Sequence, residues 1–130
     1  YILLFTCLNV RCIHIELLPN MTSASVLMAF VRFANLYGMP NKIYSDNAVS
    51  FINAVKVLDE ALLDSEFSRH LEANNVTHIR IPLYSASWGA AWERLIRVIK
   101  SCIYKSIGRK RMEYFSLVTL LSDIQSAINS

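Results

Sequence analysis

The sequence contains no apolar run near the roughly 18 residues that a membrane-spanning helix requires. The apolar opening from Tyr1 to Phe5 is far shorter, with no basic segment before it and no cleavage signal after it, unlike a signal peptide. The chain has no internal repeat, low-complexity tract or linker, and its 130 residues amount to one domain at most. Because it starts without Met, inside a strand-like pattern, we interpret the chain as a fragment with no membrane association.

Cysteine is scarce. Cys7, Cys12 and Cys102 form no C-x-x-C pair and leave an odd one, which argues against a disulfide framework and against structural zinc. We expect small buried thiols in a reducing compartment, and therefore a nuclear or cytoplasmic protein.

Acidic residues are missing from one stretch that is rich in Lys and Arg. Between residues 94 and 111 there is no Asp or Glu, while seven of the thirteen Lys and Arg lie there. Such segregation predicts a surface that faces a polyanion. The seven are Arg94, Arg97, Lys100, Lys105, Arg109, Lys110 and Arg111.

Hydrophobic periodicity predicts the order β-β-α-β-α-α-β-α-α, which is typical of a layered α/β or α+β domain. Thr22 or Ser23 caps the first helix and Gly38 ends it. The expected strands cover 1–7, 12–18, 42–46 and 77–82, the expected helices cover 23–37, 50–64, 66–74, 91–107 and 113–129, and 83–90 is expected to be a mobile loop.

Two carboxylates stand out by position. Asp46 ends a buried strand, where side chains emerge at the carboxyl edge of a sheet. Glu93 lies in the first turn of a predicted helix, with Arg97 and Lys100 on the same face at i+4 and i+7. This arrangement suits a divalent metal acting on a phosphodiester. The plainer alternatives are a turn residue for Asp46 and a helix-dipole acid for Glu93.

Four collinear segments carry a family resemblance: 1–7, 11–17, Tyr44-Ser45-Asp46-Asn47, and Trp88-Gly89-x-x-Trp92-Glu93-Arg94. Together they resemble the integrase catalytic core of retrotransposons, most of all the BEL/Pao type. The resemblance implies an α/β fold of the ribonuclease H-like kind, a mixed sheet flanked by helices, and polynucleotidyl transfer. It covers nearly all of residues 1–130 as a partial integrase core domain.

The resemblance implies an Asp-Asp-Glu triad that binds two Mg²⁺ or Mn²⁺ ions. Asp46 matches the second Asp and Glu93 the Glu, with 46 residues between them. The first Asp belongs to the family's first, central strand, which is missing here because the chain starts at what matches the second strand. Since that Asp bridges both ions in the family, we expect the chain to be inactive as given. In the family that strand lies between those matching 1–7 and 42–45, so we also expect an unpaired edge on each of these two strands, a marginal stability and a tendency to aggregate.

Two departures from the family pattern are Ala48, where Gly is usual after Asp-Asn, and Ala86–Ala90, where Pro-His-Trp-Gly-Gly is usual. The loss of glycines that permit unusual backbone angles puts the local loop geometry in question. Both departures are compatible with a decayed element copy.

The resemblance predicts DNA integration, in which element ends are trimmed and then joined to target DNA. The expected partners are both DNAs and further copies of the chain, without a small-molecule substrate. A stripe of Lys and Arg side chains binds phosphates and does not distinguish base sequences. The alternatives are a non-catalytic remnant that binds nucleic acid or a partner through its basic helix, and an unrelated α/β binding domain. The predicted DNA contacts are Asn47, Arg94, Arg97, Lys100, Lys105, Arg109, Lys110 and Arg111.

Overall fold

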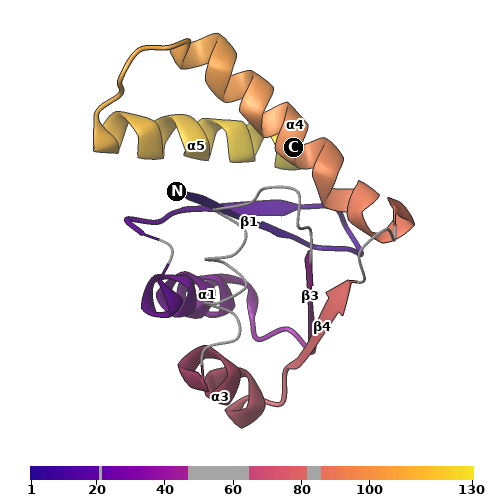
Figure 1. Cartoon of the computed structure of the whole chain (residues 1–130). Helices are drawn as coiled ribbons and strands as arrows, with labels where there is room; N and C mark the ends of the chain where they lie inside the picture. The colour runs from indigo at the N-terminus through magenta and orange to yellow at the C-terminus, as the bar shows by residue number, and fades with distance from the viewer. Residues whose placement is uncertain (21, 47–64, 82–85) are drawn as a thin grey trace. The chain divides into compact units, whose positions relative to one another are not determined.

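The computed structural model of the chain describes residues 1–20, 22–46, 65–81 and 86–130. The described part contains four strands and four helices, mixed along the chain: two strands come first and two helices last (Figure 1). They are β1 (Ile2–Thr6), β2 (Ile13–Leu17), α1 (Ser23–Tyr37), β3 (Lys42–Asp46), α3 (Ser65–Ala73), β4 (Thr77–Ile81), α4 (Ala86–Ile107) and α5 (Tyr114–Asn129).

The chain divides into two compact units. The first consists of Tyr1 and Leu18–Trp88, and the second of Ile2–Leu17 and Gly89–Ser130. Within the described residues each unit contains one two-stranded sheet: β3 and β4 pair in parallel in the first, and β1 and β2 pair antiparallel in the second.

The first unit is built on helix α1. The Thr22 side chain accepts a hydrogen bond from the Ser25 amide and so caps the helix, as predicted. Gly38 ends it with φ at 91°, a conformation that glycine adopts without a steric cost. Phe30 is almost fully buried and meets the edge of Phe67 on α3, with ring centroids 5.7 Å apart. This aromatic contact joins α1 to α3.

The second unit has its own core. Ile13 on β2, Ile99 on α4 and Ile124 on α5 are buried against one another. These three residues come from β2, α4 and α5, so this core is buried only when the hairpin and both C-terminal helices pack together. Partly buried Leu4, Ile15, Leu95, Cys102, Ile103, Leu120 and Ile128 surround them.

Helix α5 also covers an edge of the hairpin. The Asn129 and Gln125 side chains accept hydrogen bonds from the backbone amides of Ile13 and Ile15, both at 2.7 Å, and Asn129 donates to the Ile13 carbonyl at 2.8 Å. Four residues of a helix advance about 6 Å along its axis, which is close to the advance of two residues in a strand. The side chains of Gln125 and Asn129 therefore match alternate residues of β2. Helix α5 thus covers this edge of β2, which is not one of the edges that the sequence predicts to be open.

The other edge of the hairpin differs. Tyr1 and Leu18 exchange two backbone hydrogen bonds, so by antiparallel alternation Ile2, Leu4 and Thr6 direct their backbone groups away from β2. Among the described residues β1 pairs with β2 alone. This edge of β1 is where a further strand would pair.

The predicted start of the helix 91–107, the predicted loop 83–90 and the predicted burial of the cysteines need correction. Helix α4 begins at Ala86 rather than at residue 91, so residues 86–90 of the predicted loop are helical, while its residues 83–85 lie outside the described residues. The good helix formers Ala90 and Ala91 outweigh Gly89, whose cost in a helix is only about 1 kcal/mol. The thiols of Cys7 and Cys12 are exposed, since both flank the turn of the hairpin, and Cys102 is half-buried.

Most of the other predicted bounds agree with the structure to within one or two residues. The predicted helix 50–64 lies outside the described residues. No helix in the described ranges combines the length and apolar character that crossing a membrane requires.

Candidate carboxylate site and nucleic-acid interface

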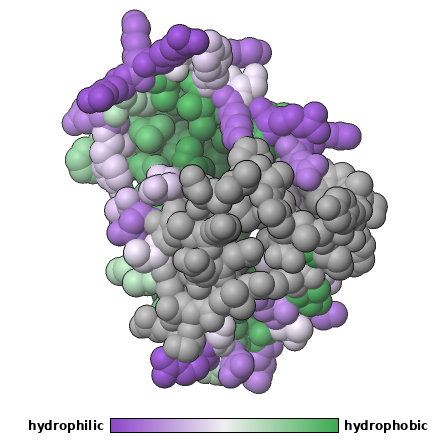
Figure 2. Space-filling model, viewed as in Figure 1, coloured by the Kyte–Doolittle hydropathy of each residue, from purple (hydrophilic) through white to green (hydrophobic). Residues whose placement is uncertain are grey.

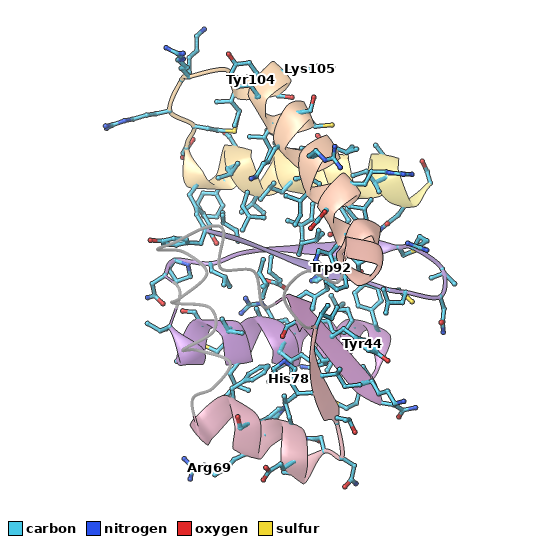
Figure 3. The ribbon with its side chains drawn as sticks, turned by 45° about the vertical axis from the view of Figure 1, so that its right-hand side comes forward. Tyr44, Arg69, His78, Trp92, Tyr104 and Lys105 are labelled. Atoms are coloured by element: carbon cyan, nitrogen blue, oxygen red, sulfur yellow. The ribbon has the colours of Figure 1, made fainter. Side chains whose placement is uncertain are left out.

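Asp46 is the last residue of β3, as the sequence predicted. Its backbone pairs with Ile81 of β4 in parallel register. The preceding residue is anchored, because Ser45 Oγ lies 2.8 Å from His78 Nε2 on the neighbouring strand. The parallel pair thus fixes the strand end that carries the carboxylate. Figure 3 labels His78 and Tyr44 on these two strands.

His78 is a residue whose role the sequence prediction missed. It makes the side-chain bridge next to Asp46. The signal was its place in the alternating strand Thr77–Ile81, beside the strand that ends at Asp46.

Glu93 is exposed on α4, seven residues after the helix begins. It therefore does not lie in the first turn, and the helix-dipole explanation of this residue is wrong, since that effect fades within one turn. The longer helix preserves the predicted spacing. Arg97 and Lys100 follow Glu93 at i+4 and i+7, and all three side chains are exposed on one stripe of α4.

The two carboxylates belong to different units, Asp46 to the first and Glu93 to the second. Their pairing in one site stays a prediction. Carboxylate oxygens suit Mg²⁺ or Mn²⁺. Among the described residues, however, there is no group of three or more His, Cys, Asp or Glu arranged to hold a metal. The two acids fit such an ion by chemistry, and a further ligand is needed to complete its site.

A shallow groove of about 440 Å³ in the second unit is lined by α4, beside the Glu93 stripe and sharing Arg97 with it. Arg94, Arg97 and Lys105 supply its positive charge, and in the described part of the chain none of them is paired with a carboxylate. Uncompensated cations on a helix face attract an anion. The groove is completed by Val98, Ser101 and Cys102.

The remaining predicted contacts lie beyond the groove, apart from Asn47, which lies outside the described residues. Arg109, Lys110 and Arg111 are exposed in the turn between α4 and α5. The basic turn consists of residues 108–113. It starts at Gly108, with φ at 64°. Figure 2 shows hydrophilic side chains gathered at the top of the molecule, beside an apolar area.

No family model matches the chain, and no curated protein is similar to it in sequence. Solved structures are similar in fold. A chain of the simian T-cell lymphotropic virus intasome, in complex with the PP2A regulatory subunit B56 gamma, superposes with a TM-score of 0.68 at 14% identity. The fold is similar to that of retroviral integrase cores.

Two isolated catalytic core domains agree with this assignment. The HTLV-2 integrase core, in complex with magnesium and in a trimeric form, gives a TM-score of 0.61 at 15% identity, and BIV integrase gives 0.61 at 14%. The matches cover 98%, 99% and 97% of this chain. The chain spans 40% of the intasome chain and 78% and 89% of the two cores, so it corresponds to the core region.

Proposed function

We propose that this chain is part of an integrase catalytic core, which binds DNA through α4 and supplies two of three metal-binding carboxylates. The observation that carries the proposal is the stripe on α4, where Glu93 is followed by Arg97 and Lys100 in an integrase-core fold. A carboxylate beside two cations places a metal ligand next to groups that hold phosphates. The BEL/Pao retrotransposon type is the finer form of the proposal, on the sequence resemblance described above.

Asp46 and Glu93 would hold Mg²⁺ or Mn²⁺, which would activate the attacking oxygen and stabilise the leaving one. Arg97 and Lys100 contribute differently. They bind the phosphates on either side of the scissile bond and orient the strand along α4. Because these interactions are with phosphates, binding depends on salt and hardly on base sequence.

The third carboxylate, on this proposal, belongs to a strand that pairs with the free edge of β1. That edge carries no strand in the described part of the chain. A strand along β1 would pair with the backbone groups of Ile2, Leu4 and Thr6 that point away from β2. Without it, the chain binds DNA and does not catalyse strand transfer.

A specific observation also favours the second candidate, a remnant that binds nucleic acid without catalysis. The groove on α4 and the basic turn lie in the second unit, where eight Lys and Arg stand against four Asp and Glu. This charge does not depend on any metal. On either candidate the protein works where nucleic acid is found, in the nucleus or the cytoplasm, and a further copy of the chain is a proposed partner.

The test is DNA binding by Arg97→Ala and Lys100→Ala, measured by fluorescence anisotropy over a range of salt. Each variant should lower duplex affinity and reduce the magnitude of the log–log salt slope by about 0.9 for each phosphate that is no longer neutralised. Lys42→Ala is the matched control, because Lys42 is an exposed cation in the first unit. Equal behaviour of all three variants would show that the stripe is merely solvated.

A further inference from the structure

The Glu93 stripe of α4 continues beyond its cations. Tyr104 follows Lys100 at i+4 and Glu93 at i+11, so it lies on the same face of the helix, about 16 Å from Glu93 along the axis. An aromatic side chain thus ends a row that starts with a carboxylate and passes two cations.

Tyr104 does not serve the core. Its side chain is 64% exposed, whereas Ile99, on the core face of the same helix, is 5% exposed. Among the described residues its ring contacts no other aromatic ring. Figure 3 shows Tyr104 and Lys105 extending outward at the end of α4 that leads into the basic turn. A large ring held in water has an open face available for stacking.

The surroundings of Tyr104 are cationic. Lys105 is its neighbour on the helix, and the basic turn follows within seven residues, with Arg109, Lys110 and Arg111 all exposed. The Gly108 amide donates to the Tyr104 carbonyl at 2.7 Å, which ties the start of the turn to the end of the helix. Phosphate-binding groups therefore flank the exposed ring.

From this juxtaposition we propose that Tyr104 and the basic turn form a subsite for unpaired nucleic acid. A base stacks on the Tyr104 ring while Lys105 and the basic turn hold the adjoining phosphates. Stacking requires a base that is free of its partner strand, so the subsite selects single-stranded over duplex nucleic acid. The subsite deepens the proposed function, because it lies on the Glu93 stripe, but its binding needs neither a metal nor Asp46.

The experiment measures anisotropy of a labelled single strand of about 12 nucleotides, within the usual site sizes, and of the same sequence as a duplex, both in EDTA. Tyr104→Ala should weaken single-strand binding about tenfold, because each stacked base contributes that order of affinity. Duplex binding should change less than about twofold, because backbone contacts do not require an open base. Tyr104→Phe keeps the ring and should bind as the wild type does.

Two further variants separate the contributions. Alanine at Arg109, Lys110 and Arg111 together should weaken binding of both ligands and reduce the single-strand salt slope by about 0.7 for each phosphate that these side chains neutralise. Tyr37→Ala is the matched control, because Tyr37 is 57% exposed on α1 in the first unit. Circular dichroism of each variant checks the fold.

A direct stacking readout completes the test. The fluorescence of 2-aminopurine within the single strand should be quenched by the wild type and by Tyr104→Phe, but not by Tyr104→Leu. The proposal is overturned if Tyr104→Ala affects both ligands equally or neither, or if it changes sedimentation of the free protein, which would mark Tyr104 as a contact between copies. Because all of these measurements are made in EDTA, a negative result at Tyr104 does not bear on the metal site of Asp46 and Glu93. Equally, the absence of metal binding at those carboxylates would not change the result at Tyr104.

Discussion

Asn129 forms a two-point hydrogen bond with the backbone of Ile13. Its Oδ1 accepts from the Ile13 amide at 2.7 Å and its Nδ2 donates to the Ile13 carbonyl at 2.8 Å, across 116 residues of sequence. A side-chain amide thereby offers a strand the donor and acceptor that a neighbouring strand would offer. The last turn of α5 closes an edge of the hairpin that would otherwise be open to aggregation.

Asn129→Ala should lower the free energy of unfolding by about 1 kcal/mol, the usual net contribution of such hydrogen bonds. Asn129→Asp should cost more, because a carboxylate oxygen would replace the donor that faces the Ile13 carbonyl. Urea unfolding measures both. The control is Ser126→Ala, an exposed position on the same helix, and a destabilisation there as large as that in Asn129→Ala would contradict a specific edge contact.

Phe30→Ala should destabilise the first unit by about 3–5 kcal/mol, since it removes a buried aromatic side chain and leaves a cavity between α1 and α3. Leu36→Ala is the matched control on the same helix. Its side chain is 67% exposed, so the change should stay within about 0.5 kcal/mol. Amide hydrogen exchange gives the result unit by unit. Equal loss of protection at both positions would show that the assigned core is wrong.

Gly38→Ala should destabilise α1 by about 1 kcal/mol, because φ at 91° is a conformation that alanine adopts only with strain. The space around Gly38 is open, so no steric clash adds to this cost. Thermal unfolding by circular dichroism detects the change. Ala34→Gly is not an equivalent control, since it weakens the helix interior. Gly38→Asn is the better comparison. With ψ at 159°, Gly38 lies outside the left-handed helical region that asparagine tolerates, so this variant should be destabilised about as much as Gly38→Ala.

Arg94→Ala and Lys105→Ala should each weaken nucleic-acid binding and reduce the salt slope, because both line the groove on α4. Their effects should be similar for single strands and duplexes, unlike that of Tyr104→Ala. Isothermal titration at two salt concentrations checks this. A variant pair that binds as the wild type does would exclude the groove from the interface and would also contradict the role of Lys105 beside Tyr104.

The local parts of the structure could be predicted from the sequence. The strand that ends at Asp46 and the caps at Thr22 and Gly38 follow from alternation and from residues with strong positional preferences. The start of α4 could not, because Gly89 and the surrounding small residues carry no periodicity. The helix there follows from the alanines that extend it.

The contacts of α5 were also beyond local prediction. Gln125 and Asn129 are polar residues on an otherwise apolar helix face, four positions apart. That spacing is a signal for a paired polar role, but the partner strand lies more than 100 residues earlier in the chain. Only the tertiary structure brings the side-chain amides of Asn129 and Gln125 to the backbone of Ile13 and Ile15.

The central claim is that Asp46 and Glu93 are ligands of one divalent metal site. The most direct measurement is paramagnetic broadening of the amide NMR signals of the chain during titration with Mn²⁺. The claim predicts weak binding, with broadening that starts around both Asp46 and Glu93 at the same Mn²⁺ concentration and is lost at both in Asp46→Asn and in Glu93→Gln. Broadening at one carboxylate without the other, or tight binding that survives both substitutions, would contradict it.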